Sequence, residues 1–253
     1  MRGDGLFHGT DTGGDTEPAG NSRGSGGSSA PDGPAALADG RLHVFSPAAA
    51  DFHRPAALTD FLARLLHCAA DGISLARDGF GRPVAARPPA DTGWPPGARL
   101  CLAAGDDPDR PLLALARDVP VALSVHTVPR GPVGELLLPF TPLERACLRR
   151  APADGRARRL ARLWTRKEAA LRLAGRCGLA AAAEVDALSG AGPEAGAATV
   201  RLPDAVAAAG GCGPVAYVRD LPAGPDRVAC AASSAPLPGI RLWDAHAAEG
   251  PVL

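Results

Sequence analysis

The spacing of hydrophobic and polar positions changes several times along the chain after residue 40. Short apolar or alternating runs predict β-strands, and they lie at 42–45, 73–76, 99–103, 112–116, 119–128, 198–202, 215–220, 228–232 and 240–243. Two longer stretches, 57–69 and 154–173, repeat apolar residues every three or four positions, which predicts amphipathic helices. Several short strands with few long helices indicate an α+β protein.

The run at 119–128 has the clearest alternation of the predicted strands. Leu123 and Val125 would point to one face of this strand, whereas Ser124 and His126 would point to the other. The strand therefore presents one apolar face and one face that carries polar side chains.

The helix predicted at 154–173 carries Trp164, Glu168 and Arg172 at intervals of four residues, so these side chains share one face. Lys167, the only lysine in the chain, precedes Glu168, and Gly175 marks the end of the helix. Glu168 and Arg172 form either an ordinary helix-surface pair or part of a functional site. These residues alone leave both interpretations open.

A shorter helix is predicted just before the long one. Thr141 is a favourable N-cap, Pro142 suits the first helical position, and Glu144 completes a capping box with Thr141. We expect this helix to end near Arg150.

The composition divides the chain into three parts. Residues 1–40 are rich in Gly, Ser, Asp, Thr and Pro, and we expect this N-terminal segment to be disordered. The remainder forms an N-terminal lobe at 41–138 and a C-terminal lobe at 139–253. Both lobes mix one main helix with several strands, which suggests two similar lobes with a cleft between them.

Charge is balanced over the 253 residues but unevenly distributed. Nine arginines lie between Arg149 and Arg176, where the only acidic residues are Asp154 and Glu168. This stretch is either a solvated helix face or a surface for an acidic partner. We expect no nucleic-acid binding, because Trp164 is the only stacking side chain in the stretch and should be buried.

The six cysteines are widely spaced and show no zinc-binding pattern, which is typical of buried thiols in a reducing compartment. No apolar run is long enough to span a bilayer, and the N-terminus does not resemble a signal peptide. We expect a monomeric cytoplasmic protein without membrane contact.

Residues 42–244 resemble the Sfp-type 4′-phosphopantetheinyl transferases. The resemblance rests on Trp164-Thr165-Arg166-Lys167-Glu168-Ala169 and on four further segments, at 81–83, 140–144, 228–229 and 240–243. The W-x-x-K-E-A block on a helix that follows a capping box is its most specific part.

The resemblance implies two pseudo-symmetric lobes, each with a small, mainly antiparallel sheet and one main helix. It also implies transfer of phosphopantetheine from coenzyme A to a serine of an acyl- or peptidyl-carrier protein, with Mg²⁺ or alternatively Mn²⁺. Glu168 and Lys167 would be the catalytic residues. Lys167 and Arg172 would contact the coenzyme A phosphates, and Arg82 would hold the nucleotide end.

The sequence departs from the family at several of its functional positions. Ser124 and His126 replace an aspartate and a glutamate that bind the metal in the family, so His126 would be the metal ligand beside Glu168. His126 is alternatively an ordinary strand histidine on the cleft wall. Ala103-Ala104-Gly105 replaces a Ser-His-Ser turn that binds the 3′-phosphate, and Arg172 replaces a lysine.

Two functional hypotheses follow. The first is a divergent 4′-phosphopantetheinyl transferase of the holo-acyl-carrier-protein synthase type. The second is a non-catalytic member of the same fold that binds or scaffolds a carrier protein or a biosynthetic enzyme. The sequence leaves open whether catalysis survives the substitutions, and which carrier protein, metal and oligomeric state apply.

Overall fold

The described part of the computed structural model comprises residues 34–37, 39–46, 55–77, 83–86, 94, 97–105, 107, 111–131, 133–188 and 196–244. Arg82, expected at the nucleotide, lies outside these residues. So does most of the segment 1–40 that the sequence predicts to be disordered. Within that segment, however, Pro34–Leu37 forms the short helix α1, and Leu37 is buried.

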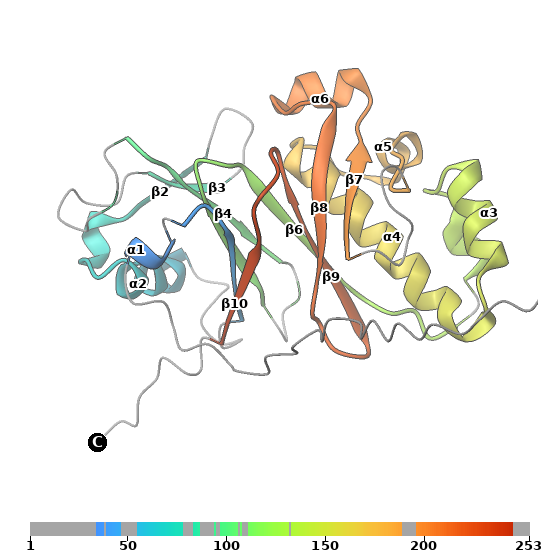
Figure 1. Cartoon of the computed structure of the whole chain (residues 1–253), viewed down its shortest axis with the longest axis horizontal. Helices are drawn as coiled ribbons and strands as arrows, with labels where there is room; N and C mark the ends of the chain where they lie inside the picture. The colour runs from blue at the N-terminus through green and yellow to red at the C-terminus, as the bar shows by residue number, and fades with distance from the viewer. Residues whose placement is uncertain are drawn as a thin grey trace, which may run out of the picture.

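Two small sheets and a few helices make up the fold (Figure 1). The other helices are α2 (Pro55–Leu65), α3 (Pro142–Arg150), α4 (Ala153–Leu173), α5 (Leu179–Glu184) and α6 (Asp204–Gly210), with 3₁₀ turns η2 (Ala70–Gly72) and η4 (Gly134–Leu137). The strands are β1 (Leu42–Ser46), β2 (Ser74–Arg77), β3 (Pro83–Ala86), β4 (Leu100–Ala104), β5 (Leu113–Arg117), β6 (Val121–Thr127), β7 (Ala197–Arg201), β8 (Val215–Leu221), β9 (Arg227–Ser233) and β10 (Ile240–Asp244). The predicted α+β class and nearly all predicted elements are confirmed.

The first sheet has the strand order β10-β1-β5-β4-β3-β2, and the second has the order β6-β9-β8-β7. All neighbouring strands are antiparallel except β1 and β10, which run parallel. Both sheets are therefore mainly antiparallel, as the family resemblance implies.

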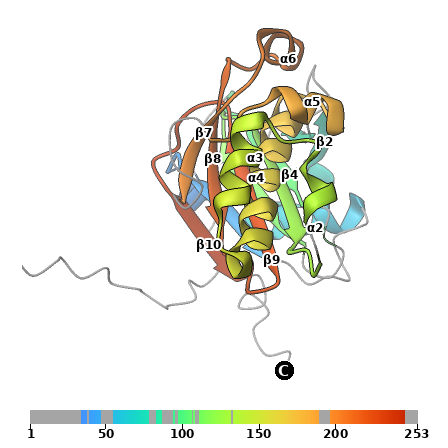
Figure 2. The ribbon, with the colours of Figure 1, turned by 90° about the vertical axis from the view of Figure 1, so that its right-hand side faces the viewer.

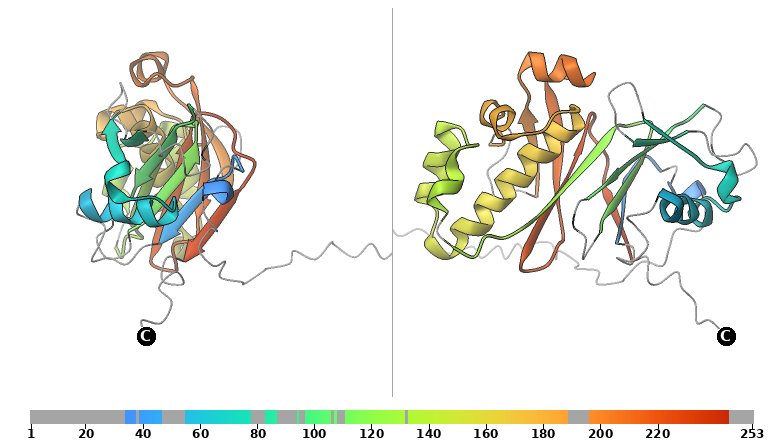
Figure 3. Two further views of the ribbon diagram at one scale, coloured as in Figure 1. Left: turned by 90° about the vertical axis from the view of Figure 1, so that its left-hand side faces the viewer. Right: turned by 180° about the vertical axis from the view of Figure 1, so that it is seen from behind.

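Alternating side chains on the strands build a layered core. In β4, Leu100 and Leu102 pack toward α2, whereas Cys101 and Ala103 pack toward the second sheet. Leu123 of β6 meets the latter residues from the opposite side. The two sheets thus pack face to face, with α2 covering the outer face of the first sheet and α4 that of the second (Figures 1 and 3).

The two sheets do not divide the chain at residue 138, where the sequence places the boundary between lobes. Strand β6 precedes this point but pairs along its length with β9 of the second sheet. Strand β10 lies at the end of the described chain but pairs with β1 of the first. Each half of the chain therefore contributes a strand to the sheet of the other half, a crossover that hydrophobic patterns do not encode.

Helices α3 and α4 begin and end as the local sequence predicts. The Thr141 hydroxyl accepts from the Glu144 backbone N–H at 3.2 Å, and the Glu144 carboxylate accepts from the Thr141 N–H at 2.7 Å. This reciprocal pair is the predicted capping box. Beyond the end of α4, Gly175 adopts a positive φ of 65°, which favours glycine.

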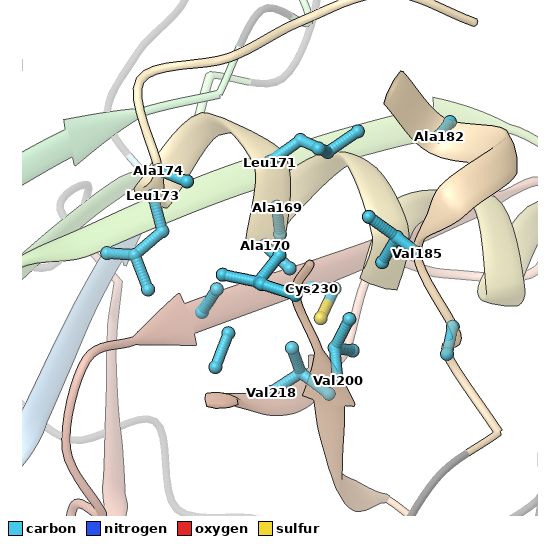
Figure 4. Close-up of a cluster of buried hydrophobic side chains, with 14 of the residues drawn as sticks. Ala169, Ala170, Leu171, Leu173, Ala174, Ala182, Val185, Val200, Val218 and Cys230 are labelled. Atoms are coloured by element: carbon cyan, nitrogen blue, oxygen red, sulfur yellow. The ribbon is translucent and has the colours of Figure 1, made fainter. Parts of the chain in front are cut away.

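Small side chains allow α4 to lie close to the second sheet. Ala169 and Ala170 are fully buried and, with Val218 and Cys230, belong to the core cluster shown in Figure 4. Figure 2 shows α3 and α4 in front of this sheet, and Figure 1 shows α3 on the side of α4 that faces away from it. No helix among the residues described here combines the length and apolarity required to cross a membrane.

Candidate functional site

The polar face of β6 and the C-terminal half of α4 bring three of the expected site residues together. Strand alternation directs Ser124 and His126 toward α4, and Glu168 reaches both of them from the helix. These positions are 44 and 42 residues apart in the chain. The three positions that the family resemblance assigns to the metal therefore meet in one place.

Hydrogen bonds occupy both oxygens of the Glu168 carboxylate. Ser124 Oγ donates to Oε2 at 2.5 Å, and His126 Nε2 contacts the same oxygen. Arg172 Nη2 donates to Oε1 at 3.0 Å, while its Nη1 donates to the Leu123 carbonyl at 3.3 Å. Arg172 is therefore attached to both the carboxylate and the backbone of β6.

An aromatic pair flanks this cluster. The His126 and Trp164 rings lie 6.1 Å apart, and Phe140 packs edge-on against Trp164 at 6.4 Å. Trp164 is partly rather than fully buried. It thus links the polar cluster to the beginning of α3.

The surroundings of Glu168 favour its charged form. Burial by itself raises the pKa of this carboxyl, but the hydrogen bonds from His126 and Ser124, together with the positive charge of Arg172, outweigh burial and lower the pKa to about 2. Glu168 is therefore a carboxylate at neutral pH. Its side chain is 19% exposed, so it lies at the edge of the solvent.

The donor set beside Glu168 does not suit magnesium. Mg²⁺ prefers an octahedral shell of oxygen atoms, and sites for it use carboxylates that are free to bind. Glu168 is the only carboxylate of the cluster, and its oxygens are engaged by three side chains. Within the described residues, no three His, Cys, Asp or Glu side chains form a metal-binding group.

Lys167 lies apart from this cluster, although it adjoins Glu168 in sequence. Its side chain is fully buried, and Nζ donates to Glu144 Oε2 at 2.5 Å. Burial lowers the pKa of Lys167, although the hydrogen bond with Glu144 opposes this effect. This burial does not fit the expected contact of Lys167 with coenzyme A phosphates. Its ammonium instead holds α4 against α3.

Glu144 has a larger role than its predicted capping function. Besides Lys167 and the Thr141 N–H, it accepts from the Ala187 N–H at 2.8 Å. One buried carboxylate thus joins α3, α4 and the segment after α5. The capping box identifies Glu144 in the sequence, but no sequence signal indicates its other two partners.

Many arginines of the basic stretch bind groups within the fold. Arg166 is fully buried and forms a two-point contact with Asp220 of β8 at 3.0 and 2.8 Å. Arg158 donates to the Gly224 and Pro225 carbonyls. The stretch between Arg149 and Arg176 is therefore not a uniformly solvated helix face, and only part of it is available to an acidic partner. Arg149 on α3 is one of its exposed residues.

Along α3 and the segment just before it, the described surface is apolar and basic. Leu138 is 76% exposed and Leu143 is 64% exposed. An open groove in this region includes Leu138, Arg145 and Arg149 in its lining. Leu138 and Leu143 lie close in sequence to Phe140, which packs on Trp164 next to the cluster.

A separate cavity of about 220 Å³ lies where the two sheets meet, and Val125 and Arg227 are among its lining residues. Arg227 forms an ion pair with Asp107 at 2.6 Å. Gly105 lies close by, since a Cβ at this position would come within 2.8 Å of Val125. The Ala103–Gly105 segment, which replaces the expected phosphate-binding turn, therefore ends beside this cavity.

Comparisons with protein-family models and with curated proteins both find no match for this chain.

Proposed function

We propose that this protein is a divergent 4′-phosphopantetheinyl transferase that acts on a serine of an acyl- or peptidyl-carrier protein. The observation that supports this proposal most strongly is the meeting of positions 124, 126 and 168. The family resemblance predicts their proximity without any knowledge of the fold. Two lobes of similar construction, each a sheet with one main helix, are consistent with the same assignment.

In the proposed reaction, His126 takes up the proton of the attacking serine. In the neutral ring, donation from Nε2 to Glu168 leaves Nδ1 as the acceptor nitrogen. The serine oxygen forms a bond to phosphorus as the bond to the bridging oxygen breaks, and adenosine 3′,5′-bisphosphate leaves. The proton passes to Nδ1, and Glu168 stabilises the resulting imidazolium.

The apolar and basic surface next to Phe140 is the proposed docking surface for the carrier protein. Leu138 and Leu143 offer exposed apolar area, and Arg145 and Arg149 offer positive charge. An acidic helix with an apolar stripe complements such a surface. A carrier bound there would lie near the Trp164 side of the cluster.

A second candidate function is a non-catalytic protein of the same fold that binds or scaffolds a carrier protein or a biosynthetic enzyme. The saturation of Glu168 by Ser124, His126 and Arg172 favours it, because none of these contacts requires a substrate or a metal. The docking surface would serve this function equally well.

Incubation with coenzyme A and a panel of apo carrier proteins tests the first proposal, with the carrier mass as readout. We expect the mass of one phosphopantetheine to be added to at least one carrier. Glu168→Gln should lower the rate by roughly 10²-fold or more, because it removes the charge behind the proton acceptor. Glu184→Gln, an exposed carboxylate on α5, is the matched control and should leave the rate unchanged.

Calorimetric titration with the same carriers distinguishes the two candidates. Carrier binding without mass addition would favour the non-catalytic function, and Leu138→Asp should weaken that binding. Transfer at full rate in Glu168→Gln would contradict the proposed role of the cluster.

A further inference from the structure

We infer that the guanidinium of Arg172 takes the place of a divalent cation as the permanent counter-charge of Glu168, so that the cluster is a metal-independent site. The inference rests on the proposed function only for the identity of the cation that is replaced. Arg172, Ser124 and His126 supply the observations that carry it.

The first observation is the orientation of Arg172. Its two terminal nitrogens are directed to different partners, Glu168 Oε1 and the Leu123 carbonyl. The guanidinium is planar and holds its donors in a fixed geometry, so it bridges helix and strand much as a bound cation would. A lysine at this position has a single charged nitrogen and cannot reproduce that arrangement as a rigid planar bridge.

The second observation concerns the opposite carboxylate oxygen. Ser124 Oγ and His126 Nε2 both meet Oε2, and both positions would carry acidic metal ligands in the family. Loss of two carboxylates removes the negative charge that a divalent cation requires. Retention of one carboxylate beside Arg172 gives a pair whose formal charges cancel.

The third observation is the compactness of the cluster. Glu168 and Arg172 are 19% and 28% exposed, and the two residues lie four apart on α4. A cation entering the site would have to displace the arginine or the histidine from the carboxylate. Both are held by the packed interface between α4 and β6.

Binding of Mn²⁺ alone, followed by electron paramagnetic resonance, tests this inference without coenzyme A or carrier protein. Wild-type protein should show no Glu168-dependent binding at roughly 1 mM Mn²⁺, the weak end of protein sites for hard divalent cations. A double variant with Ser124→Asp and His126→Glu regains both carboxylates. Adding Arg172→Gln to this double variant should increase its affinity for Mn²⁺ at least tenfold. Arg172→Lys in the same double variant is the matched control. It keeps the positive charge, so this protein should bind Mn²⁺ less tightly than the one with Arg172→Gln.

Thermal unfolding of the same proteins provides a second readout. Mn²⁺ should raise the unfolding temperature of the triple variant Ser124→Asp, His126→Glu and Arg172→Gln, because a ligand that binds only the folded state stabilises it. It should not raise that of wild type. Wild-type Mn²⁺ binding that disappears in Glu168→Gln would overturn the inference, as would equal Mn²⁺ affinity with Arg172 and with Gln at this position. Both outcomes are independent of whether the protein transfers phosphopantetheine.

Discussion

At the scale of single residues, the neighbours Lys167 and Glu168 show how position around a helix decides the role of a charge. Successive residues on an α-helix point about 100° apart. Lys167 consequently points into the buried space beside Glu144, while Glu168 points to β6 and the solvent edge. A motif of adjacent charged residues thus contains one residue that serves the fold and one that belongs to the candidate site.

We expect Lys167→Met to destabilise the protein by about 3–5 kcal/mol, because Glu144 would remain charged in the interior without its cation. Urea unfolding measures this loss, and the double substitution Glu144→Gln with Lys167→Met should cost less than the sum of the two single changes. Coenzyme A affinity of the folded protein should stay the same. A large loss of coenzyme A affinity with unchanged stability would instead indicate that Lys167 binds the phosphates.

At the scale of elements, the contact between α4 and α6 depends on a glycine. A Cβ added to Gly210 at the end of α6 would approach the Ala174 backbone to 2.4 Å, closer than real Cβ atoms come. Ala174 follows the last residue of α4 and is buried. The two helix ends therefore pack backbone to backbone, which secures the end of the helix that carries Glu168.

Gly210→Ala should destabilise the protein by about 1–3 kcal/mol, since the added methyl group meets backbone atoms that cannot move aside freely. Gly213→Ala is the matched control, because a Cβ there meets no atom within 4 Å. Urea midpoints of the two variants provide the comparison. Equal stability of Gly210→Ala and wild type would contradict the close packing of α6 on α4.

At the scale of the whole molecule, the last described strand completes the sheet that begins with the first. Trp243 of β10 donates from Nε1 to His43 Nδ1 on β1 at 3.0 Å, and His43 Nε2 meets Asp39 Oδ1 at 2.9 Å. Arg241 approaches the same aspartate at 3.1 Å. The fully buried His43 thus connects both ends of the described chain.

Stability should fall on acidification because of His43. Burial lowers its pKa below the ordinary 6.5, although the hydrogen bond with Asp39 opposes this effect. The unfolded chain therefore binds the proton at higher pH than the folded chain does. The stabilisation is fully present above pH 6.5 and is lost as pH falls from there toward the folded-state pKa.

Urea unfolding at about pH 7.5 and about pH 5.5 measures this dependence. His43→Phe keeps an aromatic ring beside Trp243 and should reduce the pH dependence, whereas His67→Asn at an exposed histidine should not. An identical pH dependence in wild type and His43→Phe would show that other groups cause it.

The sequence by itself determined most of the elements and, for α3 and α4, the residues at which they begin or end. Period and capping are local properties, so the pattern around Thr141 and Glu144 and the helix up to Gly175 were predictable from neighbouring residues. The likeness to a known family also indicated positions 124, 126 and 168. Helices α5 and α6 lie in an alanine- and glycine-rich stretch whose weak pattern did not reveal them.

Only the tertiary structure decided which partners the charged side chains meet. Arg166 with Asp220, Lys167 with Glu144, and Arg172 with the Leu123 carbonyl join residues far apart in the chain, and no local pattern specifies such pairs. The crossover of β6 and β10 between the sheets was equally undetermined, because a strand's alternation shows which face is buried but not which strand lies beside it. The environment of Glu168 follows from that pairing, since β6 brings Ser124 and His126 to α4.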